Sequence, residues 1–521
     1  MARHDPHRAI VDRRGFMGAA AAGAALAAGP AATQVPATQG IASAALSPKA
    51  GKPAPSDPDG SVSGLLARHI TGARFADLDP VTVEAAKLRL LDLVGCAIGG
   101  LRGEGSAAMA RVVAGGQDGP ASVLGTGRRS SAREAAMANA ILARAYDFEV
   151  MTVAVDGMLI PSHHAPTTVM TALALAEQQH ASGADFLTAL SVGDDLSART
   201  LAAAGIDFKD GWDGVPLHAT MGAAAIASRL LGLDAGAARH ALGMAVDQIG
   251  GTVQSIWDGA AAWKIQQGTA ARNGIFAAEL ARGGWTGMAD PLLSPRGFYA
   301  QFTPGCARPA LLAQELGRVW HGEVYYKPWP SCAANHPTIE CALTLRDRAR
   351  LDPARIGSVR ILVAPSVLDL FIAKPWATGP SAHSQANFNI RFACAAALLH
   401  GALRQEHYEP AALTDPALTS LIARTTLAPL PPRARGVIVE VTLENGRTLS
   451  EALPGRPRHY AGSTRAEVEA KFRQQVAFAG NVPAARADQI MRRIALIEKE
   501  RDMADFVQLL AAATRFPGDL T

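Results

Sequence analysis

The spacing of apolar residues between positions 63 and 317 is helical almost throughout. The stretch VTVEAAKLRLLDLVGCAIGG, residues 81–100, repeats apolar positions every three or four residues and stops at Gly99 and Gly100. This pattern is typical of a helix with a glycine C-terminus. Because such segments are rich in alanine and apolar around most of their circumference, we expect their helices to be largely buried. The same spacing recurs in three further stretches, 167–183, 222–234 and 273–287.

The pattern changes after about residue 318. SVRILVAP and GVIVEVTLENGRTL alternate or are β-branched, and the second contains the turn dipeptide Asn445-Gly446, so both indicate strands. Amphipathic helical patterns with mixed-charge faces resume toward the C-terminus and are expected to pack back on the first helices. The chain is therefore predicted to be mainly α, a large helical domain with an inserted smaller α+β domain. The predicted bounds are 63–317 for the first part of the helical domain, 318–465 for the inserted domain and 466–521 for the C-terminal return.

The N-terminus carries the features of an export signal. Arg13 and Arg14 directly precede Phe16 and an alanine-rich apolar run, which predicts a twin-arginine signal over residues 1–32 and a periplasmic or secreted protein that uses the twin-arginine export machinery. A disordered, alanine-rich tail is the alternative. The run is too short to remain as a stable membrane anchor. Residues 33–62, rich in Pro, Ala, Ser and Gly, are interpreted as a flexible linker.

Composition favours small-molecule chemistry. The 521-residue chain has a formal net charge of only +4, and no basic block is interleaved with aromatic residues, so the chain lacks the electrostatic pattern of a nucleic-acid binder. The five cysteines include no CxxC pair, and an odd number suits neither a disulfide framework nor a zinc ribbon. These cysteines are Cys96, Cys306, Cys332, Cys341 and Cys394.

The stretch AYDFEVMTVAVDGMLIPSHHAP, residues 145–166, concentrates acids and imidazoles in one loop. It places Asp147 and Glu149 a short distance before His163 and His164. Histidine moves protons near neutral pH without a large pKa shift, which suits general acid–base chemistry. A metal hydrolase built on these four residues is an alternative, but no HExxH spacing supports it, and histidines adjacent in sequence point to different sides of most backbones.

Four longer blocks resemble, in order and spacing, the signature blocks of the MmgE/PrpD family, which includes 2-methylcitrate dehydratase and cis-aconitate decarboxylase. The resemblance implies a large all-helical domain, a smaller α+β lid, a homodimer, and a cleft between the domains that binds a small carboxylic acid without a metal or cofactor. The blocks are ASVLGTGRRSSAREAAMANAILARAYDFE, LHATMGAAAIASRLLGLDAGAARHALGMAVDQIGG, GTAARNGIFAAELARGGWTG and YYKPWPSCAANH.

The resemblance also assigns site residues. The family's catalytic positions fall on Asp147, His163 and His218, and its substrate-binding positions fall on or beside Lys264, Lys327, Cys332 and His336. Counted from Gly268, the family's lysine falls on Trp263, with Lys264 adjacent to it. One residue rotates a helical side chain by roughly 100 degrees, which leaves the direction of Lys264 open. The loop before His163 is also longer than the family's loop, and Met151 stands nearest the position of an expected threonine.

These residues predict a lyase, a dehydratase or decarboxylase, that acts on a small di- or tricarboxylic acid by general acid–base catalysis. An isomerase or epimerase of such acids is the near alternative, because it requires the same proton abstraction. An exported carboxylate-binding protein that kept the cleft and lost the chemistry is the alternative from another class. Measured turnover separates the enzymes from the binding protein.

Overall fold

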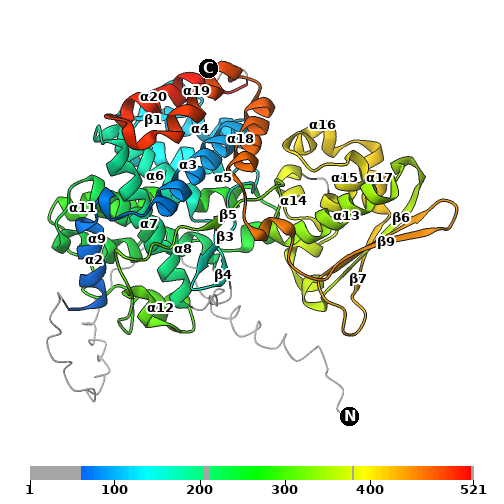
Figure 1. Cartoon of the computed structure of the whole chain (residues 1–521), viewed down its shortest axis with the longest axis horizontal. Helices are drawn as coiled ribbons and strands as arrows, with labels where there is room; N and C mark the ends of the chain where they lie inside the picture. Colours follow the sequence, from blue (N-terminus) through cyan, green and yellow to red (C-terminus); the bar gives the residue numbers. More distant parts are fainter. Residues whose placement is uncertain (1–59, 117, 205–210, 378, 380, 518–521) are drawn as a thin grey trace, which may run out of the picture. The chain divides into compact units, whose positions relative to one another are not determined.

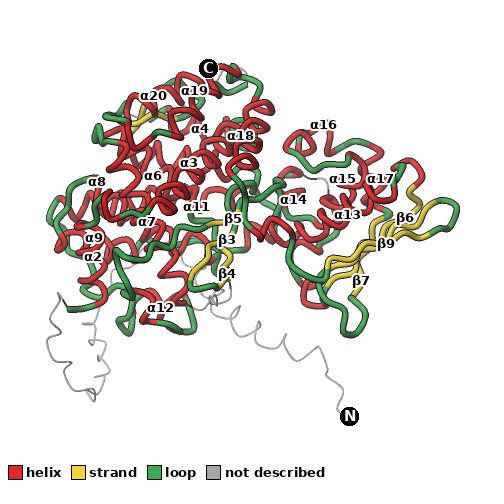
Figure 2. The backbone as a smooth tube through the Cα atoms, viewed as in Figure 1, coloured by secondary structure: helices red, strands yellow, loops and turns green. Residues whose placement is uncertain are grey.

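A computed structural model describes residues 60–116, 118–204, 211–377, 379 and 381–517. The predicted export signal and nearly all of the predicted linker lie outside these ranges. The described part of the chain is mostly helical with small sheets, as the apolar spacing predicts (Figures 1 and 2). Among the described residues, no helix has both the length and the apolar character needed to cross a bilayer.

The N-terminal part is a set of closely packed helices. Its longer helices are α2 (Val62–Gly72), α3 (Pro80–Gly100), α4 (Ser106–Ala114), α5 (Ala132–Arg144), α6 (Ala165–Gln178), α7 (Gly183–Ala204), α8 (Gly214–Leu230), α9 (Ala235–Val246) and α11 (Ile265–Arg282). Helix α3 begins at the cap residue Asp79, whose carboxylate accepts hydrogen bonds from two first-turn amides, and it ends at Gly100 as predicted. Helices α5, α6, α8 and α11 pack against one another.

Small residues allow this close packing. A Cβ atom added at Gly274 of α11 would lie only 2.5 Å from the Cβ of Ala223 on α8. A larger side chain at either position would therefore push the two helices apart. The alanine-rich composition of these segments is thus a packing requirement, and it makes the helices largely buried.

The C-terminal part contains a four-stranded sheet of order β7-β6-β8-β9. Strand β6 (Ile356–Val363) pairs parallel with β7 (Thr425–Pro429) and antiparallel with β8 (Val437–Leu443), which pairs antiparallel with β9 (Thr448–Leu453). The predicted Asn-Gly turn joins β8 to β9, with Gly446 at φ 82°. Helices α13 (His336–Ala349), α15 (Ile390–His400) and α17 (Pro416–Ala423) pack against strands of this sheet (Figure 1).

The last helices lie against the first ones. Helix α18 (Arg465–Ala479) packs on α3, where a Cβ atom at Gly95 would lie 3.1 Å from the Phe472 ring. Helices α19 (Ala484–Ala495) and α20 (Met503–Ala513) follow, and they contact α3 and α6, respectively. Residues near the two ends of the described chain therefore share one hydrophobic core.

A hairpin occupies the segment that the sequence suggested was an extended loop. Strand β3 (Thr152–Val155) pairs with β4 (Met158–Pro161) across a turn at Asp156 and Gly157, both with positive φ. This Asp-Gly turn between alternating apolar residues is the sequence signal of a type I′ hairpin, and the expectation of an irregular loop was wrong. The short strand β5 (Val324–Tyr325) adds to the other edge of β3, as the small sheet among the helices in Figure 2 shows.

Candidate active site

The C-terminal end of α5 places two opposite charges side by side. The Asp147 amide donates to the Arg144 carbonyl at 3.1 Å, and Asp147 adopts a left-handed backbone with φ 50°. This turn directs the Asp147 carboxylate back to the last turn of α5, where the Arg144 guanidinium donates to it. Both side chains are buried, so the contact is shielded from solvent.

Arg144 connects both acids of the loop and was missed by sequence reasoning. Its Nη1 donates to the carboxylates of Asp147 and Glu149, and its guanidinium carbon lies 4.6 Å from the centre of the Trp263 ring. The one available signal was its position three residues before Asp147 on a predicted helix, a spacing at which opposite charges meet.

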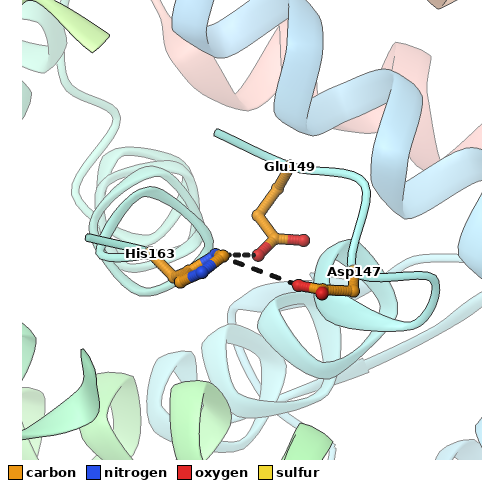
Figure 3. A group of neighbouring side chains, drawn as sticks. All are labelled: Asp147, Glu149 and His163. Atoms are coloured by element: carbon orange, nitrogen blue, oxygen red, sulfur yellow. Dashed lines mark hydrogen bonds and ion pairs between the residues drawn. The ribbon is translucent and has the colours of Figure 1, made fainter. Parts of the chain in front are cut away.

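His163 completes the cluster (Figure 3). Its Nδ1 lies 2.7 Å from Glu149 Oε1 and 4.0 Å from Asp147 Oδ1. Arg144 Nη1 also lies 3.2 Å from this nitrogen. The shorter contact is the one to Glu149, and because an ionised carboxylate only accepts hydrogen bonds, we assign the proton to Nδ1 and the free lone pair to Nε2. The His163 side chain is 14 % exposed, whereas both acids are buried. His163 is therefore the member of this cluster that a substrate can reach.

Charges in the cluster hold His163 neutral and Glu149 ionised. Burial lowers the pKa of His163, and the positive charges of Arg144 and Lys327 lower it further, against the opposing effect of Glu149. Burial alone would raise the pKa of Glu149, but Arg144, Lys327 and His163 outweigh it, and the net shift is downward. A neutral histidine backed by an ionised carboxylate is the arrangement of a general base.

The small sheet of β4, β3 and β5 positions Lys327 next to Asp147. Thr152 of β3 is paired with Tyr325 of β5, and Val153 with Val324, so Lys327 emerges from β5 directly beside the Asp147 loop. Its Nζ donates to the main-chain carbonyl and to the carboxylate of Asp147, each at 2.7 Å. The side chain is fully buried. Sequence reasoning expected this ammonium to pair with a substrate, and the structure instead shows it engaged by Asp147.

The acidic cluster also has the composition of a metal site. One ligand atom from each of Asp147, Glu149 and His163 lies within 4.8 Å of the others. However, Arg144 donates to both carboxylates and Lys327 donates to one of them, so two positive charges already balance two negative ones. A divalent cation there would face two fixed cations at close range, and we assign no metal ligand among these residues.

His218 lies beside the cluster, joined to it through Ser162. Its Nδ1 is 2.8 Å from the Gly214 carbonyl and its Nε2 is 3.2 Å from the Ser162 hydroxyl, so both ring nitrogens have partners. The ring is fully buried, and burial together with the nearby His164 lowers its pKa to about 3. The sequence predicted that His218 contacts the substrate. In the structure its Nε2 contacts the hydroxyl of Ser162, the residue before His163.

The side chains of Lys264 and Trp263 point to different partners. The Lys264 ammonium donates to the Glu104 carbonyl at 2.9 Å and lies 3.9 Å from the Glu104 carboxylate, while Trp263 faces Arg144. Trp263, the residue at the position of the family's lysine, thus contacts Arg144, which binds Asp147 and Glu149. Burial lowers the pKa of Lys264 to about 8, so a modest rise in pH removes its charge.

Cys332 and His336 follow Lys327 in the chain, Cys332 just before a 3-10 turn over Ala333–Asn335 and His336 at the start of α13. Burial and the charge of Asp147 raise the pKa of the Cys332 thiol to about 11, so it is an uncharged thiol at neutral pH. His336 Nε2 is 3.2 Å from the Ser331 carbonyl, and its ring lies 5.3 Å from Trp329. Burial and Lys327 hold the pKa of His336 well below its ordinary value. Neither side chain forms a hydrogen bond or ion pair with the Asp147 carboxylate, although the charge of Asp147 acts on Cys332.

The fold and this geometry define a mainly helical protein in which a partly exposed histidine is paired with a buried carboxylate and flanked by fixed cations. The N-terminal domain of the MmgE/PrpD family matches residues 64–308, and the C-terminal domain of the same family matches residues 329–495. The two matches together span most of the chain. The chain therefore belongs to the MmgE/PrpD family, as the sequence blocks indicated.

Several named proteins are similar to this chain. A cis-aconitate decarboxylase-like protein of Aspergillus oryzae is 27% identical over 484 residues, which is 88% of this chain and 98% of that protein. The cis-aconitate decarboxylase of Aspergillus terreus is 28% identical over 302 residues, 54% of this chain and 60% of its own length. The human cis-aconitate decarboxylase is 26% identical over 363 residues, 65% of this chain and 71% of its own. The names of these relatives are those of lyases.

Proposed function

We propose that this protein is a lyase that acts on a small di- or tricarboxylic acid by metal-free general acid–base catalysis. The observation that carries the proposal is the Glu149–His163 pair, whose Nδ1 contact of 2.7 Å leaves Nε2 as a free base on a partly exposed ring. Family membership and the names of the relatives support a lyase over other uses of such a pair.

In this reaction His163 moves a proton at the carbon next to a carboxylate. In a dehydration, Nε2 takes that proton as the hydroxyl leaves. In a decarboxylation, the electron pair left by carbon dioxide stays on carbon, and Nε2, after taking a proton from solvent, delivers it to that carbon. The Glu149 carboxylate stabilises the imidazolium form in either case, as an aspartate does in a serine-protease triad.

Fixed cations are proposed to replace a metal as the partner of the substrate carboxylates. Lys264 has the weaker attachment, because its carboxylate contact is 3.9 Å long, while Lys327 would have to exchange Asp147 for the substrate. Cys332 and His336 would shape the site beside Lys327 without carrying charge. The substrate is thus expected to bind as an anion against ammonium groups.

The test is a substrate screen followed by NMR. Purified protein is incubated with cis-aconitate, citrate, methylcitrate and malate-type acids, with cis-aconitate first because three relatives bear its name. We expect loss of water or carbon dioxide from one acid, and a drop in turnover of roughly 100- to 10,000-fold in His163→Ala. Glu177→Gln, which alters a buried carboxylate bound to Ser122, is the matched control.

Two other outcomes identify the alternatives. Exchange of a carbon-bound hydrogen in D2O without loss of mass would identify an isomerase or epimerase. Binding of an acid in calorimetry with no turnover of any acid would identify a carboxylate-binding protein and overturn the proposal.

We also propose that the protein is exported and acts as a homodimer. The export proposal rests on Arg13, Arg14 and the alanine-rich run that follows them. The dimer proposal rests on the family resemblance, and light scattering after size-exclusion chromatography measures it directly. A monomer at micromolar concentration would contradict it.

A further inference from the structure

The indole ring of Trp263 has two positive charges beside it. The Arg144 guanidinium carbon lies 4.6 Å from the centre of the ring, and the Lys264 ammonium lies 5.7 Å from the same point. All three side chains are buried, so the ring replaces part of the water that would surround each cation in solution. The two cations repel each other, and an aliphatic side chain of equal size would offer no attraction to offset that repulsion.

Packing fixes the position of the ring. Trp263 belongs to the short 3-10 helix Ala261–Lys264, and its ring meets the Phe388 ring at 5.0 Å and 87°, the edge-to-face geometry that aromatic pairs favour. Ile256 completes the buried part of this cluster, and Cys332 packs against it. The indole Nε1 has no hydrogen-bond partner among the described residues. Packing and the two cations, rather than a hydrogen bond, therefore hold the indole.

Three carboxylates act on the charge of Arg144. Its Nη1 donates to Asp147 and Glu149, and the charge of Asp213 also raises its pKa. A guanidinium stands at the end of a long side chain, which loses rotamer freedom when it is held in one place. With its carbon over the indole, the guanidinium keeps its N–H edges for carboxylates. The ring thus favours the orientation in which Arg144 binds both acids of the cluster.

We propose that Trp263 is a positioning residue for the chemistry of His163, and that it acts through Arg144. The negative face of the indole ring, and not its volume alone, holds the guanidinium on the carboxylates of Asp147 and Glu149. In that position Arg144 Nη1 also lies 3.2 Å from His163 Nδ1. This role rests on the proposed function, because it serves the same histidine.

The charges around His163 give the direction of the effect. Arg144 lowers the pKa of His163, whereas Glu149 raises it. A guanidinium that moves off Glu149 lowers the pKa of His163 less, and it leaves the Glu149 charge less neutralised. Both changes favour the imidazolium, so the pKa of His163 should rise when the ring no longer holds Arg144. The described titratable groups that face His163 are Arg144, Asp147, Glu149, Lys327 and His218.

The first experiment changes the charge of the ring face but not the shape of the ring. Tryptophans with increasing numbers of fluorine atoms on the indole replace Trp263 in the full-length chain by stop-codon suppression. Each fluorine weakens the attraction of the ring for a cation. NMR of 15N-labelled histidine gives the pH midpoint of His163, whose signal is identified by its absence in His163→Ala. We expect the midpoint to rise with each added fluorine, by about one pH unit or more in total. A midpoint that does not depend on fluorination would overturn the proposal.

The second experiment separates aromatic character from packing. The His163 midpoint should rise in Trp263→Leu, which has no ring, and should rise less in Trp263→Phe. Trp376→Leu is the matched control: the Trp376 indole nitrogen also has no partner, but its ring stacks on Phe392 and has no cation over it in the described part of the chain. A lower melting temperature in Trp263→Leu with an unchanged His163 midpoint would make the ring a packing residue only, and would refute the positioning role.

Neither titration needs a substrate, so this role and the proposed function can fail separately. With an acid that the protein converts, the acid limb of kcat should move to higher pH in Trp263→Leu, and by less in Trp263→Phe. A midpoint that shifts with fluorination in a protein that converts no acid would uphold the positioning role and count against the proposed function. Turnover whose pH profile is unchanged by fluorination would uphold the proposed function and refute the positioning role.

Discussion

Removing one charge from Glu149 gives the sharpest prediction. Glu149→Gln keeps the size of the side chain, but it replaces the carboxylate that accepts from His163 Nδ1 at 2.7 Å. It also leaves Arg144 and Lys327 facing only one buried acid, Asp147. Both changes disfavour the imidazolium that forms when His163 takes a proton. We therefore expect a slower reaction with little change in substrate affinity.

The size of the effect follows from Coulomb's law. Opposite unit charges about 4 Å apart at an effective dielectric of about 20 attract by about 4 kcal/mol. A tenfold change in rate corresponds to about 1.36 kcal/mol, so loss of this attraction predicts a fall in kcat of roughly a thousandfold. Since the Glu149 charge raises the pKa of His163, the acid limb of the rate profile should also move to lower pH.

The assay is kcat and kcat/KM against pH for the acid that the wild-type protein converts. Glu177→Gln is the control, because it makes the same chemical change in a buried carboxylate of α6 whose partners are Ser122 and Arg129. A variant Glu149→Gln with wild-type kcat, or with an acid limb displaced to higher pH, would refute the general-base role of His163.

Four further results are expected. Lys327→Ala should lower the melting temperature as well as weaken substrate binding, since breaking a buried ion pair costs about 3–5 kcal/mol and Lys327 is fully buried against Asp147; an unchanged melting temperature in differential scanning calorimetry would contradict this. Prolonged chelation should leave activity unchanged, and loss of activity that zinc restores would revive a metal mechanism. The pKa of Asp194 lies below its ordinary 3.8, so ionised Asp194 stabilises the folded protein above that pH, and this contribution is lost as the pH falls through the native pKa. In urea unfolding, the free energy of unfolding should therefore fall less between neutral and acid pH in Asp194→Asn than in the wild type. Arg13→Lys with Arg14→Lys should leave an uncleaved cytoplasmic precursor, and normal periplasmic yield in fractionation would disprove the signal.

Much of the fold could be predicted because its signals are local. Helix α3 is marked by a capping aspartate, a regular apolar stripe and terminal glycines, and its bounds in the structure follow these signals. The β8–β9 hairpin is marked by its Asn-Gly turn. The β3–β4 hairpin after Met151 has an equally local signal, the Asp156-Gly157 dipeptide. This signal was missed because the whole segment was interpreted as a lengthened loop.

The site was harder to predict because its contacts are not local. His163 could be identified from the sequence, and the structure places it near Asp147 and Lys327, but the sequence does not show which of these charges pair with one another. Arg144 satisfies both acids, and an arginine at the end of a helix is common on any protein surface. The partner of Lys327 follows from the pairing of β5 with β3, a contact between segments whose individual sequences are too short to predict it.

The two-residue strand β5 has a consequence for the order in which the molecule loses structure. Its pairing with β3 fixes Lys327 against Asp147, 180 positions away in the chain. Backbone hydrogen bonds from Met151 to Tyr325 and from Ala154 to Glu323 hold this contact, whereas long helices hold the surrounding core. Short elements with few hydrogen bonds open at lower free energy than the core around them. In mild denaturant the protein should therefore lose its active site before its helices, with the amide hydrogens of Met151 and Ala154 exchanging first.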